Sequence, residues 1–202
     1  MSVPFVSILR TGLANLASVC AAFERLNVGW KVIEVEEEIL DSDYLVLPGV
    51  GSFGACMEGL EKRALVSPLR ERFSVGKPLL SICLGMQLAG QESEESPGSE
   101  GLGVVAGPVI RLPDTYSVPQ IGWNKVISSP NHRYIRDGYA YFANSYAFGA
   151  TVVGWDVATF DYGGEYVAAM ERGPQLICQF HPELSGEWGE TLLKRWLGLG
   201  VA

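Results

Sequence analysis

The feature that most constrains the fold is an alternation of apolar runs and amphipathic runs in the first half of the chain. Runs at Phe5–Leu9, 30–35, 44–47 and 78–82 have the length of strands, and the last is apolar almost throughout, as expected of a strand buried on both faces. Residues 15–26 space their apolar side chains three and four positions apart, as on one helix face. This alternation is typical of βαβ units and predicts a parallel sheet covered by helices.

The second half of the chain has a different pattern. Its apolar runs are short and interrupted by Gly, Pro, Asn and Asp, which predicts antiparallel strands rather than further βαβ units. The runs lie at 103–112, 120–127, 139–148, 152–160, 166–171 and 176–180, and an amphipathic helix is expected at 186–197. The predicted fold class is α/β: an open, mostly parallel central sheet flanked by helices in three layers, with an additional antiparallel β region in the C-terminal half. A length of 202 residues suits one domain, 1–202.

Composition and charge exclude several classes of function. Hydrophobic residues make up 48% and charged residues 19%, as in folded proteins. The net charge of −8 disfavours nucleic acid and anionic lipid as partners. The N-terminal apolar run lacks a basic lead-in and ends at Arg10, and no run approaches the roughly 18 apolar residues of a membrane helix, so we expect a cytoplasmic protein. The four cysteines are scattered, and no metal is expected.

Cys83 is the candidate nucleophile. It stands where the run at 78–82 meets a predicted helix start at 83–90, and residues 81–85, Ser-Ile-Cys-Leu-Gly, have the small-x-nucleophile-x-Gly form of a nucleophile elbow, with Ser81 where glycine is usual. A thiol at such a turn meets the positive end of a helix dipole, which favours the thiolate, and the N–H of Leu84 is a candidate oxyanion donor. On this motif alone, a core cysteine at a tight turn is the alternative.

The sequence holds only two histidines, so there are few candidates for the base. His132 lies in a polar stretch at 131–138, which predicts a surface position. His181 follows an apolar run and opens a His-Pro-Glu tripeptide, in which Pro182 rigidifies the turn and Glu183 is close enough to fix the imidazole tautomer. Taken alone, His181 could equally be a strand-end histidine bonded to a loop, but its pairing with Cys83 favours the base.

A glycine-rich segment at 48–54, Pro-Gly-Val-Gly-Ser-Phe-Gly, follows the run at 44–47 and precedes a predicted helix that extends through Leu60. After a parallel strand, such a loop presents backbone N–H groups at the sheet edge where open α/β proteins bind ligands. It lacks the Lys-Ser/Thr pair of a P-loop and the register of a dinucleotide fingerprint. A plain strand-to-helix turn is one interpretation, and a second oxyanion donor is the favoured one.

The segment Ile-Cys-Leu-Gly-Met-Gln at 82–87, together with His-Pro-Glu at 181–183, resembles the class I, or triad, glutamine amidotransferases. Within this family the chain is more similar to the glutaminase subunits of imidazole glycerol phosphate synthase, over nearly its whole length. The similar segments lie at 12–19, 48–54, 56–57, 119–124 and 141–146. Ile-Gly-Trp-Asn at 121–124 and Tyr-Phe-x-x-Ser-Tyr at 141–146 separate this group from related amidotransferases.

The resemblance implies a site and a partner. It implies a catalytic triad of Cys83, His181 and Glu183, and glutamine held by Gln87 and by the backbone around Gly51, Ser145 and Tyr146. It also implies that Val50 supplies a reorienting oxyanion N–H. Trp123 and Asn124 are expected near the interface of a heterodimer with a (β/α)₈ cyclase, HisF, which would use the ammonia to form imidazole glycerol phosphate and an aminoimidazole carboxamide ribotide. No cofactor is implied.

Three positions depart from the family pattern. Arg-Thr-Gly at 10–12 replaces Asp-Tyr-Gly, Asn144 stands where histidine is common, and Leu184 stands where a lysine commonly follows His-Pro-Glu. These changes leave the triad intact and bear on docking of the partner and on signalling. Two alternatives stay open: an amidotransferase that serves another synthase, such as a sugar-modifying paralogue, and a non-catalytic or peptidase-like relative of the same fold.

Overall fold

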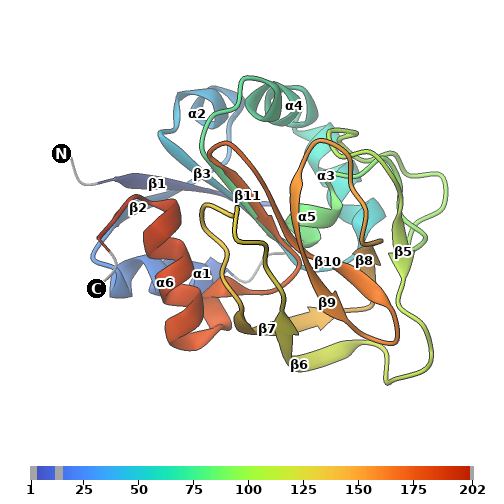
Figure 1. Cartoon of the computed structure of the whole chain (residues 1–202). Coiled ribbons are helices and arrows are strands. Elements are labelled where there is room, and N and C mark those ends of the chain that lie inside the picture. Colours follow the sequence, from blue (N-terminus) through green and yellow to red (C-terminus); the bar gives the residue numbers. More distant parts are fainter. Residues whose placement is uncertain (1–3, 12–15, 201–202) are drawn as a thin grey trace.

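A seven-stranded sheet runs through the centre of the computed structural model, which describes residues 4–11 and 16–200 (Figure 1). The strand order is β2-β1-β3-β4-β11-β10-β9. The bounds are β1 Phe5–Leu9, β2 Gly29–Ile33, β3 Tyr44–Gly49, β4 Leu79–Cys83, β9 Asp156–Asp161, β10 Glu165–Arg172 and β11 Gln175–Cys178. Strands β2, β1, β3, β4 and β11 are parallel, and β10 and β9 continue the sheet antiparallel. The predicted mostly parallel sheet is confirmed.

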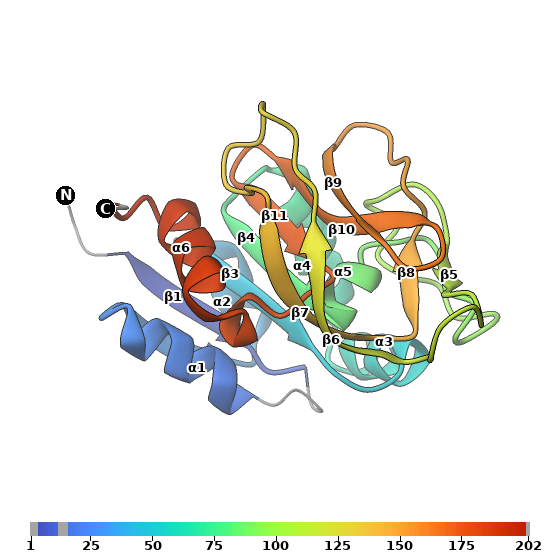
Figure 2. The ribbon, with the colours of Figure 1, turned by 60° about the horizontal axis from the view of Figure 1, so that its bottom comes forward.

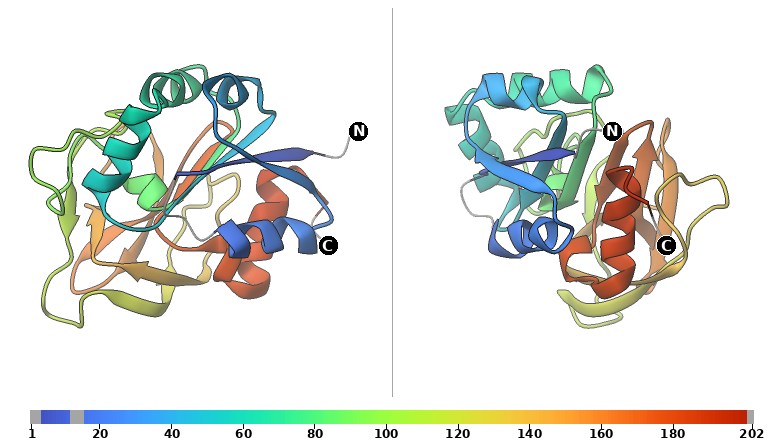
Figure 3. Two further views of the ribbon diagram at one scale, coloured as in Figure 1. Left: turned by 180° about the vertical axis from the view of Figure 1, so that it is seen from behind. Right: turned by 90° about the vertical axis from the view of Figure 1, so that its left-hand side faces the viewer.

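Helices cover both faces of this sheet (Figure 3). One face carries α1 (Leu16–Arg25) and α6 (Gly186–Trp196), and the other carries α2 (Glu36–Asp41), α3 (Phe53–Lys62) and α4 (Val66–Ser74). The helix predicted to extend through Leu60 is confirmed and ends at Lys62, the helix predicted at 186–197 is confirmed to within one residue, and α2 and α4 add to them. The helix expected from residue 15 is described from Leu16 onward, and residue 15 lies outside the described residues.

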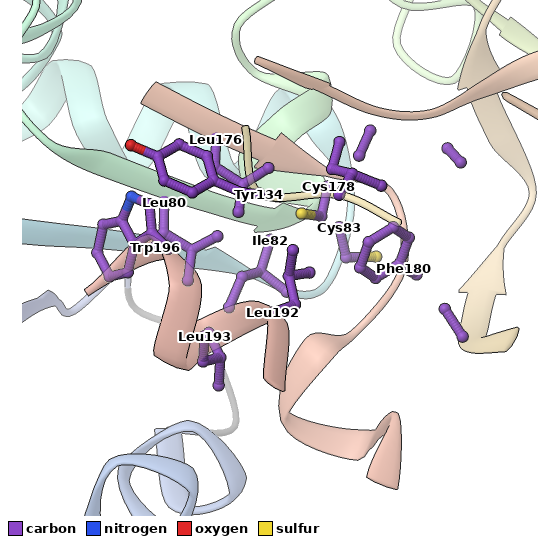
Figure 4. Close-up of a cluster of buried hydrophobic side chains, with 14 of the residues drawn as sticks. Leu80, Ile82, Cys83, Tyr134, Leu176, Cys178, Phe180, Leu192, Leu193 and Trp196 are labelled. Atoms are coloured by element: carbon purple, nitrogen blue, oxygen red, sulfur yellow. The ribbon is translucent and has the colours of Figure 1, made fainter. Parts of the chain in front are cut away.

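The core forms two layers because successive residues of a strand point to opposite faces. Ile8 on β1 and Leu80 on β4 pack in the layer beneath α1 and α6, whereas Leu47 on β3 and Leu79 on β4 pack in the layer beneath α3 and α4. Figure 4 shows the first layer, with Leu192, Leu193 and Trp196 of α6 gathered near Leu80, Ile82 and Leu176 of the sheet. Each such buried side chain contributes about 1.5–3 kcal/mol to the free energy of unfolding.

Two antiparallel ribbons complete the C-terminal half. β6 (Gln120–Val126) pairs with β7 (Gly138–Asn144), and β5 (Val109–Arg111) pairs with β8 (Tyr146–Phe148). Figure 2 shows β6 and β7 in front of the central sheet. The run at 103–112 becomes a strand only at its end, because the backbone N–H groups of residues 101–105 bond instead to the turns at 88–91.

The expectation that the strands of the second half are all antiparallel is wrong for β11. A tight turn at Gly173, where φ is 59°, returns the chain from β10 so that β11 lies parallel to β4 and joins the two halves of the sheet. Within residues 4–11 and 16–200, every helix is too short or too polar to span a lipid bilayer.

The predicted surface position of His132 is also wrong. Only 3% of this residue is exposed, and its Nδ1 accepts a hydrogen bond of 2.8 Å from the backbone N–H of Ser129. The loop around it folds inward because the buried carboxylate of Glu171 on β10 accepts hydrogen bonds of 2.8–2.9 Å from the backbone N–H groups of residues 133–135. His132 is therefore part of a packed loop.

Candidate active site

Cys83 lies at a strained elbow at the carboxyl end of β4. Its backbone has φ 53° and ψ −111°, outside the regions that L-residues ordinarily adopt. Such a conformation costs on the order of 1–3 kcal/mol and persists where the surrounding structure enforces it. The helix that follows, α5 (Leu84–Gln87), has four residues and is shorter than the predicted segment at 83–90. The expected strand-to-helix turn at Cys83 is present.

Close backbone contacts enforce this elbow. A Cβ atom on Gly85 would lie 2.1 Å from the carbonyl oxygen of Leu47 on β3, and one on Gly49 would lie 2.6 Å from the backbone nitrogen of Gly85. Real Cβ atoms do not approach other atoms so closely, so both positions require glycine. The end of β3 and the turn after β4 can therefore pack backbone against backbone.

His181 and Glu183 form a buried pair beyond the end of β11. His181 Nδ1 lies 2.8 Å from Glu183 Oε1, and both residues are less than 10% exposed. Glu183 belongs to a short 3₁₀ turn, η1 (Pro182–Leu184), that brings the carboxylate back to the imidazole. This bond occupies Nδ1 and leaves Nε2 of His181 available to the Cys83 side chain, which lines the same cavity.

These neighbours make the imidazole strongly basic. Burial alone lowers the pKa of His181, but the hydrogen bonds to Cys83 and Glu183 and the negative charges on both raise that pKa from 6.5 to about 10. With a pKa of about 10, the imidazolium form of His181 persists at neutral pH. Such a pair can attack with a thiolate and deliver a proton to a leaving group.

The turn that carries His181 is attached to β7. The backbone N–H of His181 donates to the carbonyl of Tyr141 at 2.9 Å. The hydroxyl of Ser185 accepts from the Tyr141 N–H at 3.0 Å and donates to the His181 carbonyl at 2.6 Å. The position of the base thus depends on the β6–β7 ribbon as well as on β11.

A cavity of about 220 Å³ opens beside Cys83 and His181. The six residues predicted to bind the substrate all line it: Val50, Gly51, Leu84, Gln87, Ser145 and Tyr146. Glu183 lies behind His181 and is not part of the lining. In the described part of the chain, no three His, Cys, Asp or Glu side chains come together as a metal site would need.

The glycine loop on the other side of the cavity is fixed at both ends. The Thr11 hydroxyl donates to the carbonyl of Pro48 at 3.2 Å, and the Glu95 carboxylate accepts from the backbone N–H of Phe53 at 2.7 Å. Between these contacts, Gly51 has φ 102°, a left-handed conformation that suits glycine, and is exposed. Thr11, which departs from the family pattern, thus contacts the loop; its neighbour Arg10 pairs with Glu34 on the surface.

Of the other departures and the predicted interface residues, only Asn144 lines the cavity; Leu184, Trp123 and Asn124 do not. Asn144 is buried and lines it, with Nδ2 donating to the Tyr146 carbonyl at 3.0 Å and no partner for Oδ1 within the described residues. Leu184 is 43% exposed and is the last residue of η1, the turn that follows His181. Trp123 is 57% exposed on β6 and contacts the Tyr141 ring edge-on, and Asn124 donates to the backbone of a neighbouring strand.

Two further residues at the site were not predicted from the sequence. Glu95 lines the cavity, but in the sequence it is one of several acids in a polar stretch. Gln179 is fully buried beside Cys83, with Nε2 3.8 Å from the sulfur. An amide side chain in the apolar run at 176–180 was the signal that could have identified it.

Comparison with known sequences agrees with this geometry. The family model for class I glutamine amidotransferases matches residues 9–197. The HisH subunit of imidazole glycerol phosphate synthase from Pectobacterium atrosepticum is 43% identical over 197 residues, which cover 95% of this chain and 98% of the relative. The HisH subunit from Halalkalibacterium halodurans is 40% identical over 201 residues and covers 95% of this chain and 94% of the relative.

Solved structures share the fold at lower sequence identity. A crystal structure of a glutamine amidotransferase superposes with a TM-score of 0.74 at 21% identity, over 95% of this chain and 96% of the other. PurLQS from Thermotoga maritima gives a TM-score of 0.76 at 15% identity, over 98% of this chain and 99% of the other. The chain is therefore an enzyme of the class I glutamine amidotransferase family and belongs, within that family, to the HisH subunits.

Proposed function

We propose that this chain hydrolyses glutamine to glutamate and ammonia through Cys83, His181 and Glu183, as the glutaminase subunit of an imidazole glycerol phosphate synthase. The observation that carries the proposal is the strained Cys83 elbow facing the buried His181–Glu183 pair across one small cavity. A nucleophile, a base and a group that orients the base are the three parts that thiol acyl transfer requires.

In the first half of the reaction, the Cys83 thiolate attacks the side-chain carbonyl carbon of glutamine. A carbon–sulfur bond forms, and the carbonyl oxygen takes the negative charge. The backbone N–H groups of Leu84 and of Val50 are the proposed donors to this oxyanion. When the carbon–nitrogen bond breaks, the His181 imidazolium donates its Nε2 proton to the nitrogen, and ammonia leaves behind a glutamyl thioester.

In the second half, water hydrolyses the thioester. His181, now neutral, takes a proton from the water as its oxygen attacks the carbonyl carbon. The carbon–sulfur bond then breaks, glutamate is released, and the Cys83 thiolate and the imidazolium are restored. Throughout, Glu183 holds Nδ1 and stabilises the imidazolium, as its 2.8 Å contact supports.

The lining of the cavity suits an amino acid as the substrate. A volume of about 220 Å³ is small for a peptide, which argues against a peptidase-like activity. Glu95 brings a carboxylate to the cavity that can pair with the α-ammonium group of glutamine. Gln87, Ser145 and Tyr146 supply the polar groups proposed to hold the remainder of the substrate.

We also propose that a (β/α)₈ cyclase of the HisF type receives the ammonia in a heterodimer. Ammonia released into water would be protonated and lost, so transfer requires a closed interface. Trp123 and Ile121 expose apolar surface on β6, beside the cavity-lining residue Pro119, and form part of the proposed interface with Asn124. The cyclase would combine the ammonia with a phosphoribulosyl formimino-carboxamide to give imidazole glycerol phosphate and an aminoimidazole carboxamide ribotide.

The test is glutamine hydrolysis by the chain mixed with a HisF cyclase and the ribulosyl substrate, compared with the chain alone. We expect strong stimulation by the partner, and loss of activity in Cys83→Ala. Full activity in Cys83→Ala would show that the nucleophile is wrong. Hydrolysis by the wild type that ignores this partner would instead assign the chain to another synthase.

A further inference from the structure

A chain of amide groups links the cavity to the sulfur of Cys83. Gln87 Nε2 donates to the carbonyl of Tyr146 at 2.9 Å and to Gln179 Oε1 at 3.2 Å. Gln179 Nε2 in turn lies 3.8 Å from Cys83 Sγ, within hydrogen-bonding distance for sulfur. Gln179 directly follows β11, is fully buried, and is fixed through its own backbone N–H, which donates to Ala168 at 2.8 Å.

The contacts of Gln87 determine which end of the Gln179 amide faces the thiol. Both hydrogens of Gln87 Nε2 are used, one by Tyr146 and one by Gln179. The group that Gln179 turns towards Gln87 must therefore be an acceptor, its Oε1. Its N–H group must then point to the other side, where Cys83 lies.

Besides the His181 imidazole, two neighbours of the sulfur favour opposite protonation states of Cys83. The carbonyl of Ala143 lies 3.8 Å from Cys83 Sγ and can accept a hydrogen bond only from the protonated thiol. The N–H of Gln179 donates, and a donor binds a thiolate more strongly than a thiol. Because this part of the site is buried, either contact is stronger than it would be in water.

We propose that Gln179 is a further catalytic residue, whose amide N–H stabilises and orients the Cys83 thiolate, and that Gln87 fixes the direction of this amide. The proposal rests on the proposed function in one respect, the identity of Cys83 as the nucleophile. Gln87 then has two roles, because it lines the cavity and also holds the amide that contacts the sulfur. No described residue donates to Gln87 Oε1, so the group that Gln87 offers to the substrate is an acceptor.

The experiment measures alkylation of Cys83 by iodoacetamide between pH 5 and pH 10, with the peptide that contains Cys83 quantified by mass spectrometry. Gln179→Met keeps an unbranched side chain of similar length but removes the donor. We expect the pH of half-maximal alkylation to rise by about one unit, and glutamine hydrolysis at pH 7 to fall about tenfold.

Gln175→Met is the matched control. Gln175 is also a fully buried glutamine and is the first residue of β11, at the opposite end of the strand from Gln179. Its Nε2 donates to the carbonyl of Phe73 and not to the sulfur. The Gln175→Met variant should be less stable than the wild type but should have the same pH of half-maximal alkylation. Thermal unfolding of both variants separates a loss of folding from a change at the sulfur.

A second variant is needed because Gln179→Met could fail to fold. Gln179→Asn keeps an amide but is one methylene shorter, so its nitrogen cannot reach the sulfur. We expect the pH of half-maximal alkylation to rise by the same amount as in Gln179→Met. An unchanged alkylation profile in a folded Gln179 variant would overturn the proposal. Alkylation requires no glutamine, so the two proposals can fail separately. If the Gln179 variants shift the alkylation profile but the wild-type chain fails to hydrolyse glutamine, the proposed function is refuted and the role of Gln179 stands.

Discussion

The two sides of the cavity differ in how firmly they are held. On one side, every residue from 81 to 90 is buried, and the strained Cys83 backbone is locked by the contact between Gly85 and Leu47. On the other side, Gly51 and Ser52 are exposed and Val50 is half-buried, so that the segment at 50–52 is held mainly through its ends. The proposed nucleophile is therefore held firmly, whereas few contacts hold the opposite wall of the site.

This difference shows where control of the enzyme is best placed. Moving the nucleophile would require repacking of the core, which is energetically costly. Reorienting one peptide group at Val50, the proposed oxyanion donor, disturbs few contacts, yet the loss of one preorganised oxyanion donor typically lowers the rate by about 10²–10³. A partner protein that acted on the exposed loop could thus switch the rate strongly and leave the triad unchanged.

The largest effect is expected from Gly85→Ala. The added Cβ would lie 2.1 Å from the carbonyl oxygen of Leu47, a backbone atom that cannot move aside easily. We expect a loss of more than about 4 kcal/mol in the free energy of unfolding and no measurable glutaminase activity. Gly59→Ala is the control, because a Cβ atom at that position on α3 meets nothing within 4 Å. Equal stability of the two variants would disprove the rigid elbow.

Glu183→Gln tests the fixed side without altering its shape. It keeps the size of the side chain but removes the negative charge 2.8 Å from His181 Nδ1. We expect kcat to fall by about 10²–10⁴ while the protein stays folded, as measured by steady-state kinetics and thermal unfolding. Glu187→Gln, at an exposed position in the first turn of α6, should leave kcat unchanged. A decrease of less than threefold would contradict the role of Glu183.

The pH dependence follows from the raised pKa of His181. Because this pKa is about 10 in the folded state and 6.5 ordinarily, its contribution to stability is complete below pH 6.5 and is lost as the pH rises through 10. The imidazolium proposed to protonate the leaving ammonia is lost over the same upper range. We therefore expect kcat/KM to decline near pH 10, and to decline at lower pH in Glu183→Gln. If the decline of kcat/KM at high pH lies at the same pH in Glu183→Gln as in the wild type, loss of the His181 proton is not its cause.

Glu95→Gln tests the movable side. Its carboxylate caps the backbone N–H of Phe53 and lines the cavity, so the variant loses both a charge-assisted contact to the loop and the proposed partner of the substrate ammonium. We expect KM for glutamine to rise about tenfold, with a smaller change in kcat. Glu92→Gln is an exposed control in the same segment. A change in kcat alone would show that Glu95 acts on the loop and not on the substrate.

Thr11→Val is expected to have the smallest effect. It preserves the shape of a buried side chain and removes the 3.2 Å hydrogen bond to the Pro48 carbonyl at the start of the loop. We expect a loss of about 1 kcal/mol in stability and a change of a few-fold in hydrolysis without a partner. Alkylation of Cys83 should not change, because the one hydrogen bond of the Thr11 side chain to a described residue goes to Pro48 and not to the elbow. Thr151→Val, at an exposed position, provides the comparison.

The fixed side of the site could be predicted from the sequence better than the movable side. An apolar strand that runs into Ser-Ile-Cys-Leu-Gly has few possible structures, and with only two histidines the choice of base was narrow. The structure places Cys83, His181 and Glu183 together, as the two sequence motifs taken jointly, and the family resemblance, had suggested. Strand length and periodicity likewise predicted the parallel half of the sheet.

Contacts between distant segments could not be predicted. Polar neighbours suggested that His132 is exposed. Its loop is buried instead, because the loop backbone donates hydrogen bonds to Glu171 on β10, which is distant in the sequence. Thr11 was notable only as a departure from the family pattern, because its partner Pro48 lies 37 residues away, near the end of β3. Gln179 acquires its role from Gln87, far away in the chain, and no local pattern encodes such a pairing.

The contact between Gly49 and Gly85 has a consequence for engineering this site. Because each glycine leaves room for the backbone near the other, the two positions act as one unit although they lie in separate sequence motifs. If the turn that carries Cys83 were grafted onto another scaffold, the end of β3 would have to be transferred with it. A library that varies the segments around Cys83 and around Val50 independently would consist mostly of misfolded chains, whereas one that keeps this glycine pair could explore the rest of both segments.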